Sequence, residues 1–352
     1  MRVLIAQTSF LGDVVLSTPV FAAVRRHYPD AHVTVLVRPE SADILDGHPH
    51  VDAVLTDDKR HSERGLGSLR VLRKLRAGRF DMALALHKSF RTAWLLAAAG
   101  IPRRIGFRQS AGWFLYHRRV RFDPARHVVE RNLAILTGCD IDAGGAVTRP
   151  FVACPPAATA RLRTLLDAHR VAADARLVAV APGSVWATKR WTVDGYAALL
   201  GDLQRDLGAT PLLLGGPADA AYAEAIARAA GGGVVNLVGR TDLGMLTAAI
   251  DQSQLLVTND SAPLHIAVAR GTPVVAIFGP TTPAQGFGPY TDRACVVQRE
   301  LSCRPCSRHG GPRCPIGTHA CMREISHTDV RRAAAALLQR CAGEARRAAS
   351  SL

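Results

Sequence analysis

Short apolar runs alternate with longer amphipathic stretches along the first half of the chain. Four of the runs are predicted strands, at residues 3–6, 33–37, 54–55 and 82–86. The stretches between them space apolar residues at helical intervals, around Val20 to Val24, over 41–45 and over 69–76. Apolar strands that alternate with helices are typical of a parallel sheet covered by helices on both faces. We therefore predict an α/β unit here.

The same alternation starts again in the second half. The predicted strands are 177–180, 211–214, 234–238, 255–258 and 274–278, and the predicted helices are 193–207, 220–230, 243–253, 264–270 and 330–347. Small residues and prolines interrupt the pattern at 140–156, which indicates an interdomain connection. The sequence thus predicts two Rossmann-like domains, 1–155 and 156–330, and a C-terminal helix, 331–352. A cleft between such domains, faced by the carboxyl ends of both parallel sheets, is a natural ligand site.

Several classes of protein lose support from what the sequence lacks. Its longest apolar run, near 92–101, is about half the ~20 residues that a membrane span needs. The apolar run at the N-terminus is too short for a signal peptide, so we expect a cytoplasmic protein. Neither a P-loop nor a G-x-G-x-x-G turn is present. Asp140-Ile141-Asp142 has the spacing of some metal-dependent sugar transferases, but it lies in the connection and not at a strand end, so we count no metal site there.

Two segments of the second half carry candidate anion-binding residues. "APGSVWATKRW" at 181–191 follows a predicted strand, and its Gly-Ser turn, Ser184, Thr188 and Lys189 offer N–H groups, hydroxyls and a cation. "TNDSAPLHIAVARGTPVVAIFGPTTP" at 258–283 places Asp260 or Ser261 as the cap of a helix with Pro263 in its first turn. The positive end of that helix dipole favours a pyrophosphate. Asp260 could equally be a plain helix cap, and Lys189 a surface lysine.

Asp13 stands in the apolar context "TSFLGDVVLSTP" directly after the first predicted strand. A helix cap would explain an aspartate but not the apolar residues on both sides of it. Partial desolvation would make this carboxylate a stronger proton acceptor, and Gly12 lets the backbone approach a ligand closely. We expect Asp13 to point into the cleft as a base.

Charge and cysteine content add two features. Lys and Arg number 44 against 29 Asp and Glu, a net charge of +15, which indicates an anionic partner or only an arginine-rich composition. Four of the eight cysteines are bunched, at Cys303, Cys306, Cys314 and Cys321. Their last interval is wider than in common zinc motifs. We expect reduced cysteines in an ordered tail, with structural zinc as the alternative and His309 or His319 as substitute ligands.

These segments together resemble the ADP-heptose:lipopolysaccharide heptosyltransferases of glycosyltransferase family 9. The resemblance rests on "TSFLGDVVLSTPV", "APGSVWATKRW", "TNDSAPLHIAVARGTPVVAIFGPT" and "CRPCSRHGGPRCPIGTHACM", in that order over nearly the whole chain. The last segment is most similar to the heptosyltransferase II branch. The resemblance implies a GT-B fold, with the donor in the C-terminal domain and the acceptor in the N-terminal domain. It also implies inverting transfer of heptose from ADP-L-glycero-D-manno-heptose to the inner core of lipopolysaccharide.

The resemblance also implies roles for single residues. Asp13 matches the general base, and Lys189, with Thr188 beside it, matches the lysine near the donor phosphates. Asp260 and His265 match a donor-binding pair, with Ser184 and Ser261 in the same two motifs. Glu224 is expected at the ribose and Met245 at the adenine. The family usually has Gly where this sequence has Ala262. The added methyl group lies at the start of the phosphate-binding helix, where it affects which donor fits.

A helix N-terminus and Lys189 can stabilise a departing diphosphate without a metal or another cofactor. The expected partners are therefore the nucleotide sugar and an anionic, lipid-anchored acceptor met at the inner face of the inner membrane. The arginines of 103–108 and 118–121 and the aromatic residues between them suit such an acceptor. No nucleic-acid-binding motif is present. Three alternatives stay open: another nucleotide-sugar donor, a non-catalytic nucleotide- or nucleic-acid-binding protein, and a sugar epimerase of similar shape.

Overall fold

The computed structural model describes residues 1–58, 66–142 and 149–350. The chain divides into two compact units, Met1–Ala153 and Cys154–Leu352, called unit 1 and unit 2 below. The boundary lies two residues before the one expected from the sequence. Among the described residues, no helix combines the length and the apolar character that crossing a membrane requires.

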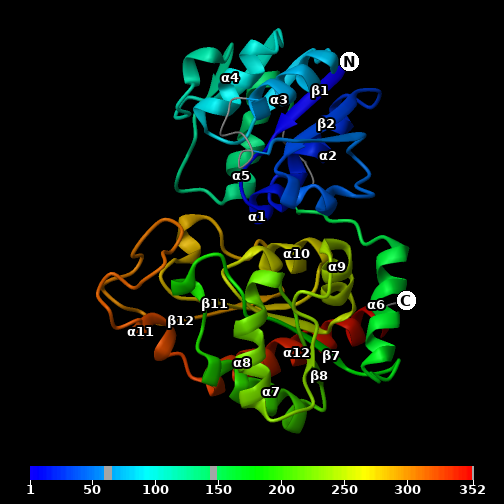
Figure 1. The fold of residues 1–352 in the computed structure, drawn as a ribbon, viewed down its shortest axis with the longest axis vertical. Helices are drawn as coiled ribbons and strands as arrows, with labels where there is room; N and C mark the ends of the chain where they lie inside the picture. Colours follow the sequence, from blue (N-terminus) through cyan, green and yellow to red (C-terminus); the bar gives the residue numbers. More distant parts are fainter. Residues whose placement is uncertain (59–65, 143–148, 351–352) are drawn as a thin grey trace. The chain divides into compact units, whose positions relative to one another are not determined.

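Unit 1 is built on a six-stranded parallel sheet in the order β3-β2-β1-β4-β5-β6 (Figure 1). Its strands are β1 (Arg2–Ala6), β2 (His32–Val37), β3 (Ala53–Thr56), β4 (Met82–Ala85), β5 (Arg103–Phe107) and β6 (Arg118–Val120). Its helices are α1 (Leu11–Val15), α2 (Thr18–His27), α3 (Leu66–Ala77), α4 (Phe90–Ala98) and α5 (Val128–Leu133), with 3₁₀ turns that include η4 (Trp113–Leu115) and η5 (Ala134–Cys139). This strand order is that of a Rossmann fold.

Unit 2 repeats this topology with the order β12-β11-β10-β7-β8-β9. Its strands are β7 (Leu177–Ala181), β8 (Thr210–Leu213), β9 (Val235–Asn236), β10 (Leu255–Asn259), β11 (Val274–Phe278) and β12 (Ala294–Gln298). Its helices are α6 (Pro156–Ala168), α7 (Val193–Leu207), α8 (Ala220–Ala230), α9 (Leu243–Gln252), α10 (Ala262–Arg270), α11 (Ala320–Arg323) and α12 (His327–Ser350), and η6 covers Ala187–Lys189. All its strand pairs are parallel.

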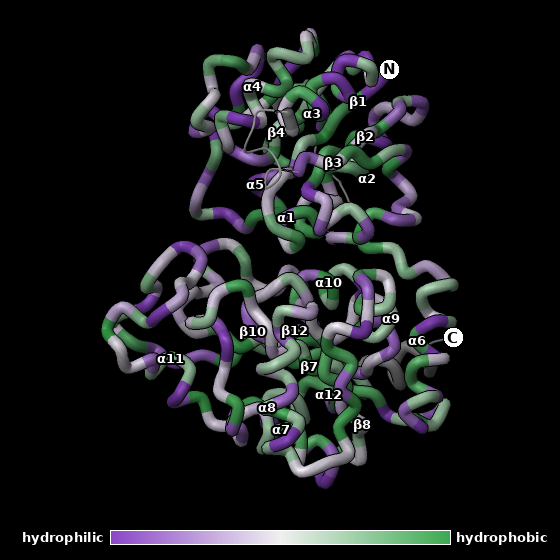
Figure 2. Tube along the Cα trace, viewed as in Figure 1, coloured by the Kyte–Doolittle hydropathy of each residue, from purple (hydrophilic) through white to green (hydrophobic). Residues whose placement is uncertain are grey.

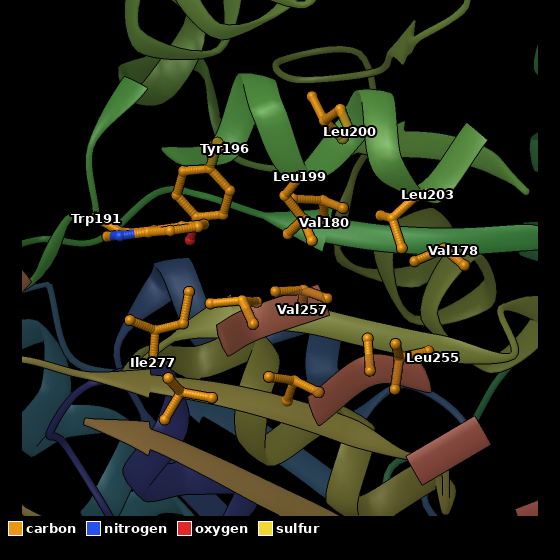
Figure 3. Close-up of a cluster of buried hydrophobic side chains, with 14 of the residues drawn as sticks. Val178, Val180, Trp191, Tyr196, Leu199, Leu200, Leu203, Leu255, Val257 and Ile277 are labelled. Carbon is orange, nitrogen blue, oxygen red and sulfur yellow. The ribbon is translucent and has the colours of Figure 1, made fainter. Parts of the chain in front are cut away.

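The core of unit 2 lies between its sheet and the helices that cover it. Figure 3 shows Tyr196, Leu199 and Leu203 of α7 directed at the apolar side chains of β7 and β10. On α12, Val330, Ala334 and Leu337 recur at helical spacing and are buried in the same core. The C-terminal helix is therefore an integral layer of unit 2. Figure 2 shows hydrophobic colouring in the interior of both units, where the inner strands β1 and β7 are almost wholly buried, as expected for strands covered on both faces.

A few elements differ from those that the sequence predicts. Residues 41–45 form two 3₁₀ turns, η1 (Pro39–Ser41) and η2 (Asp43–Leu45), and not one helix. Pro39 starts the first turn, and the segment ends before Gly47, whose φ of +70° suits glycine. The predicted pattern also omitted several elements, among them α4, β5, α5, β12, β6, which is an edge strand of arginines, and α6, which begins after Pro155 within the expected connection.

His48 is buried in unit 1 against the rings of Phe21 and Phe151. Its Nδ1 accepts a hydrogen bond from the His50 N–H at 3.2 Å. Burial, and secondarily the charge of His50, lowers the pKa of His48 from 6.5 to about 4. The neutral imidazole is therefore the form that the fold accommodates.

We expect the stability of unit 1 to fall as the pH drops from about 6.5 to about 4. In that range the unfolded chain binds a proton at His48 and the folded chain does not, so acid favours unfolding by up to about 3 kcal/mol. Denaturant titrations at several pH values measure the loss. His48→Phe should flatten the profile, whereas His27→Gln, at an exposed histidine, should not. An unchanged profile in His48→Phe would contradict the assignment.

Candidate functional site

A buried ion pair lies at the carboxyl ends of three neighbouring strands of unit 2. Lys189 Nζ donates to Asp260 Oδ2 at 2.6 Å, and Thr281 Oγ1 donates to the same oxygen at 2.7 Å. Lys189 follows β7, Asp260 follows β10 and Thr281 follows β11, and these strands are adjacent in the sheet. The side chains of Lys189 and Asp260 are only 13% and 8% exposed. The carboxylate thus fixes the ammonium group, whose other N–H bonds can still serve an anion.

Asn259 organises the backbone around this pair, and no local sequence pattern singled it out. Its Nδ2 donates to the carbonyl of Pro182 at 2.7 Å. Its Oδ1 accepts from the Trp191 N–H at 3.3 Å and from the Tyr196 hydroxyl at 3.0 Å. One buried amide therefore joins the end of β10 to both ends of the 182–191 loop that carries Lys189. Thr281 was also missed, because its contact with Asp260 spans 21 residues.

A second ion pair supports the same loop. Arg190 Nη2 lies 3.2 Å from Asp219 Oδ1, and Arg190 Nε donates to the Ser184 carbonyl at 3.1 Å. Burial raises the pKa of Asp219, and the nearby Arg190 partly opposes this. Gly183 lets the carboxylate approach the loop closely, since a Cβ there would lie 2.3 Å from Asp219 Oδ2.

Gly183→Ala should therefore displace Asp219 and weaken its pair with Arg190. We expect the free energy of unfolding to fall by about 1–3 kcal/mol, together with a weaker anion site at Lys189. Denaturant titration and calorimetry with ADP measure the two effects. Gly216→Ala is the matched control, because a Cβ at Gly216 meets nothing within 4 Å and its φ is −81°. Equal stability in the two variants would argue against the role of Gly183.

The start of α10 agrees only partly with expectation. Ser261 is the N-cap residue, Ala262 begins the helix and Pro263 follows it, but the Ser261 side chain makes no capping hydrogen bond. Its Oγ lies 3.2 Å from Thr258 Oγ1. His265 is buried within α10, at 4% exposure. The first turn of α10 therefore follows closely on Asp260. The side chain of the N-cap residue, Ser261, does not bond to the N–H groups of that turn.

Thr188 and Ser184 lie in the same loop as Lys189 and are both buried. Thr188 Oγ1 donates to the Gly311 carbonyl and accepts from the Gly311 N–H, both at 2.9 Å. His319 Nε2 lies 2.8 Å from the Thr188 carbonyl. The hydroxyl of Thr188 is thus bonded to the cysteine-rich segment, and this segment braces the Lys189 loop.

The bunched cysteines of this segment are free thiols. Cys306, Cys314 and Cys321 line a small cavity beside Thr188. Burial raises the pKa of Cys321 to about 11, whereas the His319 N–H on Cys314 lowers the pKa of that partly exposed thiol. Across the described parts of the chain, no three His, Cys, Asp or Glu side chains are arranged to hold a metal ion, and Asp140 and Asp142 are both exposed.

Two predicted donor residues lie outside the network around Asp260. Glu224 is exposed on α8. Met245 is buried in the first turn of α9, where its N–H donates to the N-cap carboxylate of Asp242 at 2.8 Å. Their roles toward a nucleoside stay predictions.

Asp13 lies in unit 1, after the carboxyl end of β1. Its Oδ2 accepts from Ser9 Oγ at 2.7 Å and from the Phe10 N–H at 3.3 Å. Asp13 is half-buried, and Val14 and Val15 beside it are fully buried. Phe10 departs from the expected apolar surrounding, because it is 44% exposed and lies 4.9 Å from the Arg38 guanidinium. The hydrogen bonds from Ser9 and Phe10 orient this carboxylate just beyond the carboxyl end of the inner strand β1.

Two Rossmann-like units in one chain are the architecture of the GT-B glycosyltransferases, and the second unit carries the Lys189–Asp260 ion pair at its strand ends. Residues 68–314 match glycosyltransferase family 9 (heptosyltransferase). A lipopolysaccharide heptosyltransferase 3 of Escherichia coli is 30% identical over 77% of this chain and 82% of its own. A lipooligosaccharide heptosyltransferase 2 of Haemophilus influenzae is 26% identical over 85% and 88%.

The fold agrees with this assignment. The structure of the E. coli ADP-heptose lipopolysaccharide heptosyltransferase II superposes with a TM-score of 0.77, at 22% identity over 97% of this chain and 99% of that one. The chain belongs to glycosyltransferase family 9 and is an enzyme of the GT-B fold. The resemblance stated from the sequence and the predicted fold class are confirmed.

Proposed function

We propose that this enzyme transfers L-glycero-D-manno-heptose from the ADP-linked sugar to the inner core of lipopolysaccharide, with inversion at the anomeric carbon. The observation that carries the proposal is the Lys189–Asp260–Thr281 site in a chain that is similar to heptosyltransferases over most of its length. Unit 2 binds the donor and unit 1 binds the acceptor.

Lys189 and the first turn of α10 stabilise the diphosphate as it departs. Lys189 supplies a full positive charge that Asp260 holds in place, and α10 supplies the positive end of its dipole. Ser184, Ser261, Ala262 and His265 complete this phosphate site, and Thr188 positions its loop. Glu224 binds the ribose hydroxyls and Met245 lies against the adenine. These groups supply the charge that the reaction needs without a metal ion or other cofactor.

Asp13 acts as the general base. It takes the proton of the acceptor hydroxyl while that oxygen attacks the anomeric carbon and the bond to the ADP oxygen breaks. The hydrogen bonds from Ser9 and Phe10 orient Oδ2 of this carboxylate. The reaction passes through a transition state with oxocarbenium-ion character, which a nearby carboxylate stabilises electrostatically.

The acceptor is an anionic glycolipid, so the enzyme works in the cytoplasm at the inner face of the inner membrane. The net charge of +15 supports an anionic partner. The similar heptosyltransferases of E. coli and H. influenzae, which act on lipopolysaccharide or lipooligosaccharide, support the same acceptor. A nucleic acid is not part of this proposal.

Calorimetry with a panel of nucleotide sugars tests the donor assignment. We expect ADP-heptose to bind at least ~10-fold more tightly than UDP- or GDP-linked sugars, and Lys189→Met to weaken all ADP compounds. Ala262 supports a second candidate, another nucleotide sugar, because its methyl group stands at the start of the phosphate-binding helix. That candidate would be favoured if a different nucleotide sugar bound more tightly than ADP-heptose and if Ala262→Gly increased the affinity for ADP-heptose. No binding of any nucleotide would overturn both.

A further inference from the structure

Unit 1 carries a cavity of about 620 Å³ with a wall of arginine side chains. Its charged lining residues are Arg118, Arg119, Arg121, Arg126, Arg131 and Asp123. The only carboxylate among them, Asp123, already pairs with Arg126 at 3.4 Å. Five arginines therefore line one space together with a single carboxylate, which is already paired. Such a cavity is built for an anion, since guanidinium binds phosphate and carboxylate oxygens in pairs.

The cavity follows the edge strand of the sheet. Arg118 and Arg119 belong to β6, Arg121 follows it, and η5 forms the opposite wall. Gly138 of η5 packs so closely on the sheet that a Cβ would lie 2.6 Å from Ile105 Cγ2. Arg118, Arg119 and Arg121 are exposed. Within the described residues, none of these three arginines forms an ion pair, so their charges remain available to a ligand.

Four exposed aromatic side chains of α4 and η4 are called the aromatic patch: Phe90, Trp94, Trp113 and Phe114. They are between 39% and 56% exposed. The rings of Phe90 and Phe114 are 6.3 Å apart, those of Trp113 and Phe114 are 6.0 Å apart, and Trp94 lies one helical turn from Phe90 on α4. Arg119 joins the patch to the cavity, since its guanidinium lies 4.8 Å from the ring of Trp113.

Neighbouring α3 extends the basic character of this surface. It packs on α4 (Figure 1) and exposes Leu69, Arg70, Arg73 and Lys74 to solvent. Exposed tryptophan and phenylalanine next to basic side chains are typical of surfaces that enter a membrane–water interface. Each basic residue near an anionic leaflet adds attraction, and the aromatic rings add apolar contact that charge alone does not provide.

We propose that unit 1 docks on an anionic phospholipid bilayer through this surface, with a headgroup phosphate in the arginine cavity and the aromatic patch in the interface. Through this surface the enzyme meets the membrane that carries its acceptor. Only the identity of that membrane rests on the proposed function. Docking itself needs neither donor nor acceptor.

Flotation with lipid vesicles tests the proposal without any sugar substrate. Vesicles of phosphatidylcholine alone are compared with vesicles of equal parts phosphatidylcholine and phosphatidylglycerol. We expect binding only to the anionic vesicles, weakened by salt, with a blue shift of tryptophan emission from Trp94 and Trp113. Arg118→Glu/Arg121→Glu should weaken binding by roughly 30-fold or more. Arg228→Glu/Arg323→Glu, which reverses two exposed arginines of unit 2, is the matched control.

The contribution of the aromatic patch is tested by Phe114→Ser. Ile316→Ser in unit 2 is the matched control, because these two side chains are 56% and 58% exposed. Only Phe114→Ser should weaken binding, by several-fold. Circular dichroism and melting curves confirm that each variant folds, and the neutral pair Arg118→Gln/Arg121→Gln should give an intermediate loss of binding.

Three results would overturn the docking proposal. The first is equal binding to both kinds of vesicle, and the second is an equal loss of binding in the cavity variants and the control variants. The third is a dimer that forms without lipid and that Phe114→Ser dissociates, because the surface would then be an interface between two copies of the chain. A protein that docks but fails to transfer heptose would overturn the proposed function alone.

Discussion

Replacing Asp13 by asparagine should lower kcat for sugar transfer by about 10³-fold while donor affinity changes less than about threefold. Asparagine keeps the shape of the side chain and an oxygen that can accept from Ser9 and Phe10, but it cannot take a proton at neutral pH. Initial rates at saturating donor and acceptor, together with calorimetry on ADP, separate the two effects.

Ser9→Ala is the graded companion to this variant. It removes the 2.7 Å hydrogen bond that orients the Asp13 carboxylate but leaves the carboxylate itself, so we expect a fall in kcat of about 10-fold or less. An Asp13→Asn enzyme that retains more than about a tenth of the wild-type rate would assign the base to another residue.

Lys189→Met should produce the second large effect, on both stability and catalysis. It leaves the carboxylate of Asp260, 8% exposed, with the Thr281 hydroxyl but without its cation. We expect the free energy of unfolding to fall by about 3 kcal/mol and kcat/KM for the donor to fall at least ~10²-fold. Denaturant titration and initial rates measure the two changes.

The double variant Lys189→Met/Asp260→Asn separates these effects. Removing the unpaired carboxylate should restore most of the lost stability, because no buried charge remains. The rate should stay low, since the cation that stabilises the diphosphate is still missing. A double variant that recovers both stability and rate would show that Lys189 only serves the fold.

The strands and helices that the sequence predicted well are those whose pattern is local. The 193–207 helix is α7, whose ends are marked by Thr192, which caps it, and Gly208, which has a φ of +57°. Helix 220–230 likewise ends before Gly231, and the apolar run 274–278 is β11. Strand β6 lacked any such signal, because its arginines face the solvent at a sheet edge.

The candidate site was predictable only in part, for the same reason. Lys189 and Asp260 stand in separate motifs after separate strands, and the parallel topology brings them together as expected. The supporting contacts run between segments far apart in the sequence: Asn259 to Pro182 spans 77 residues and Arg190 to Asp219 spans 29. No local pattern encodes such contacts. The hydroxyl of Thr188, predicted for a phosphate, is bonded to Gly311 instead.

The most direct test of the proposed function is transfer itself. The enzyme is incubated with ADP-L-glycero-D-manno-heptose and a heptose-deficient lipopolysaccharide core in the presence of EDTA, and the product is analysed by mass spectrometry. The proposal predicts a gain of one heptosyl residue by the acceptor, undiminished by EDTA and lost in Asp13→Asn, which still binds ADP. An acceptor of unchanged mass, from a wild-type enzyme that binds the donor, would contradict it.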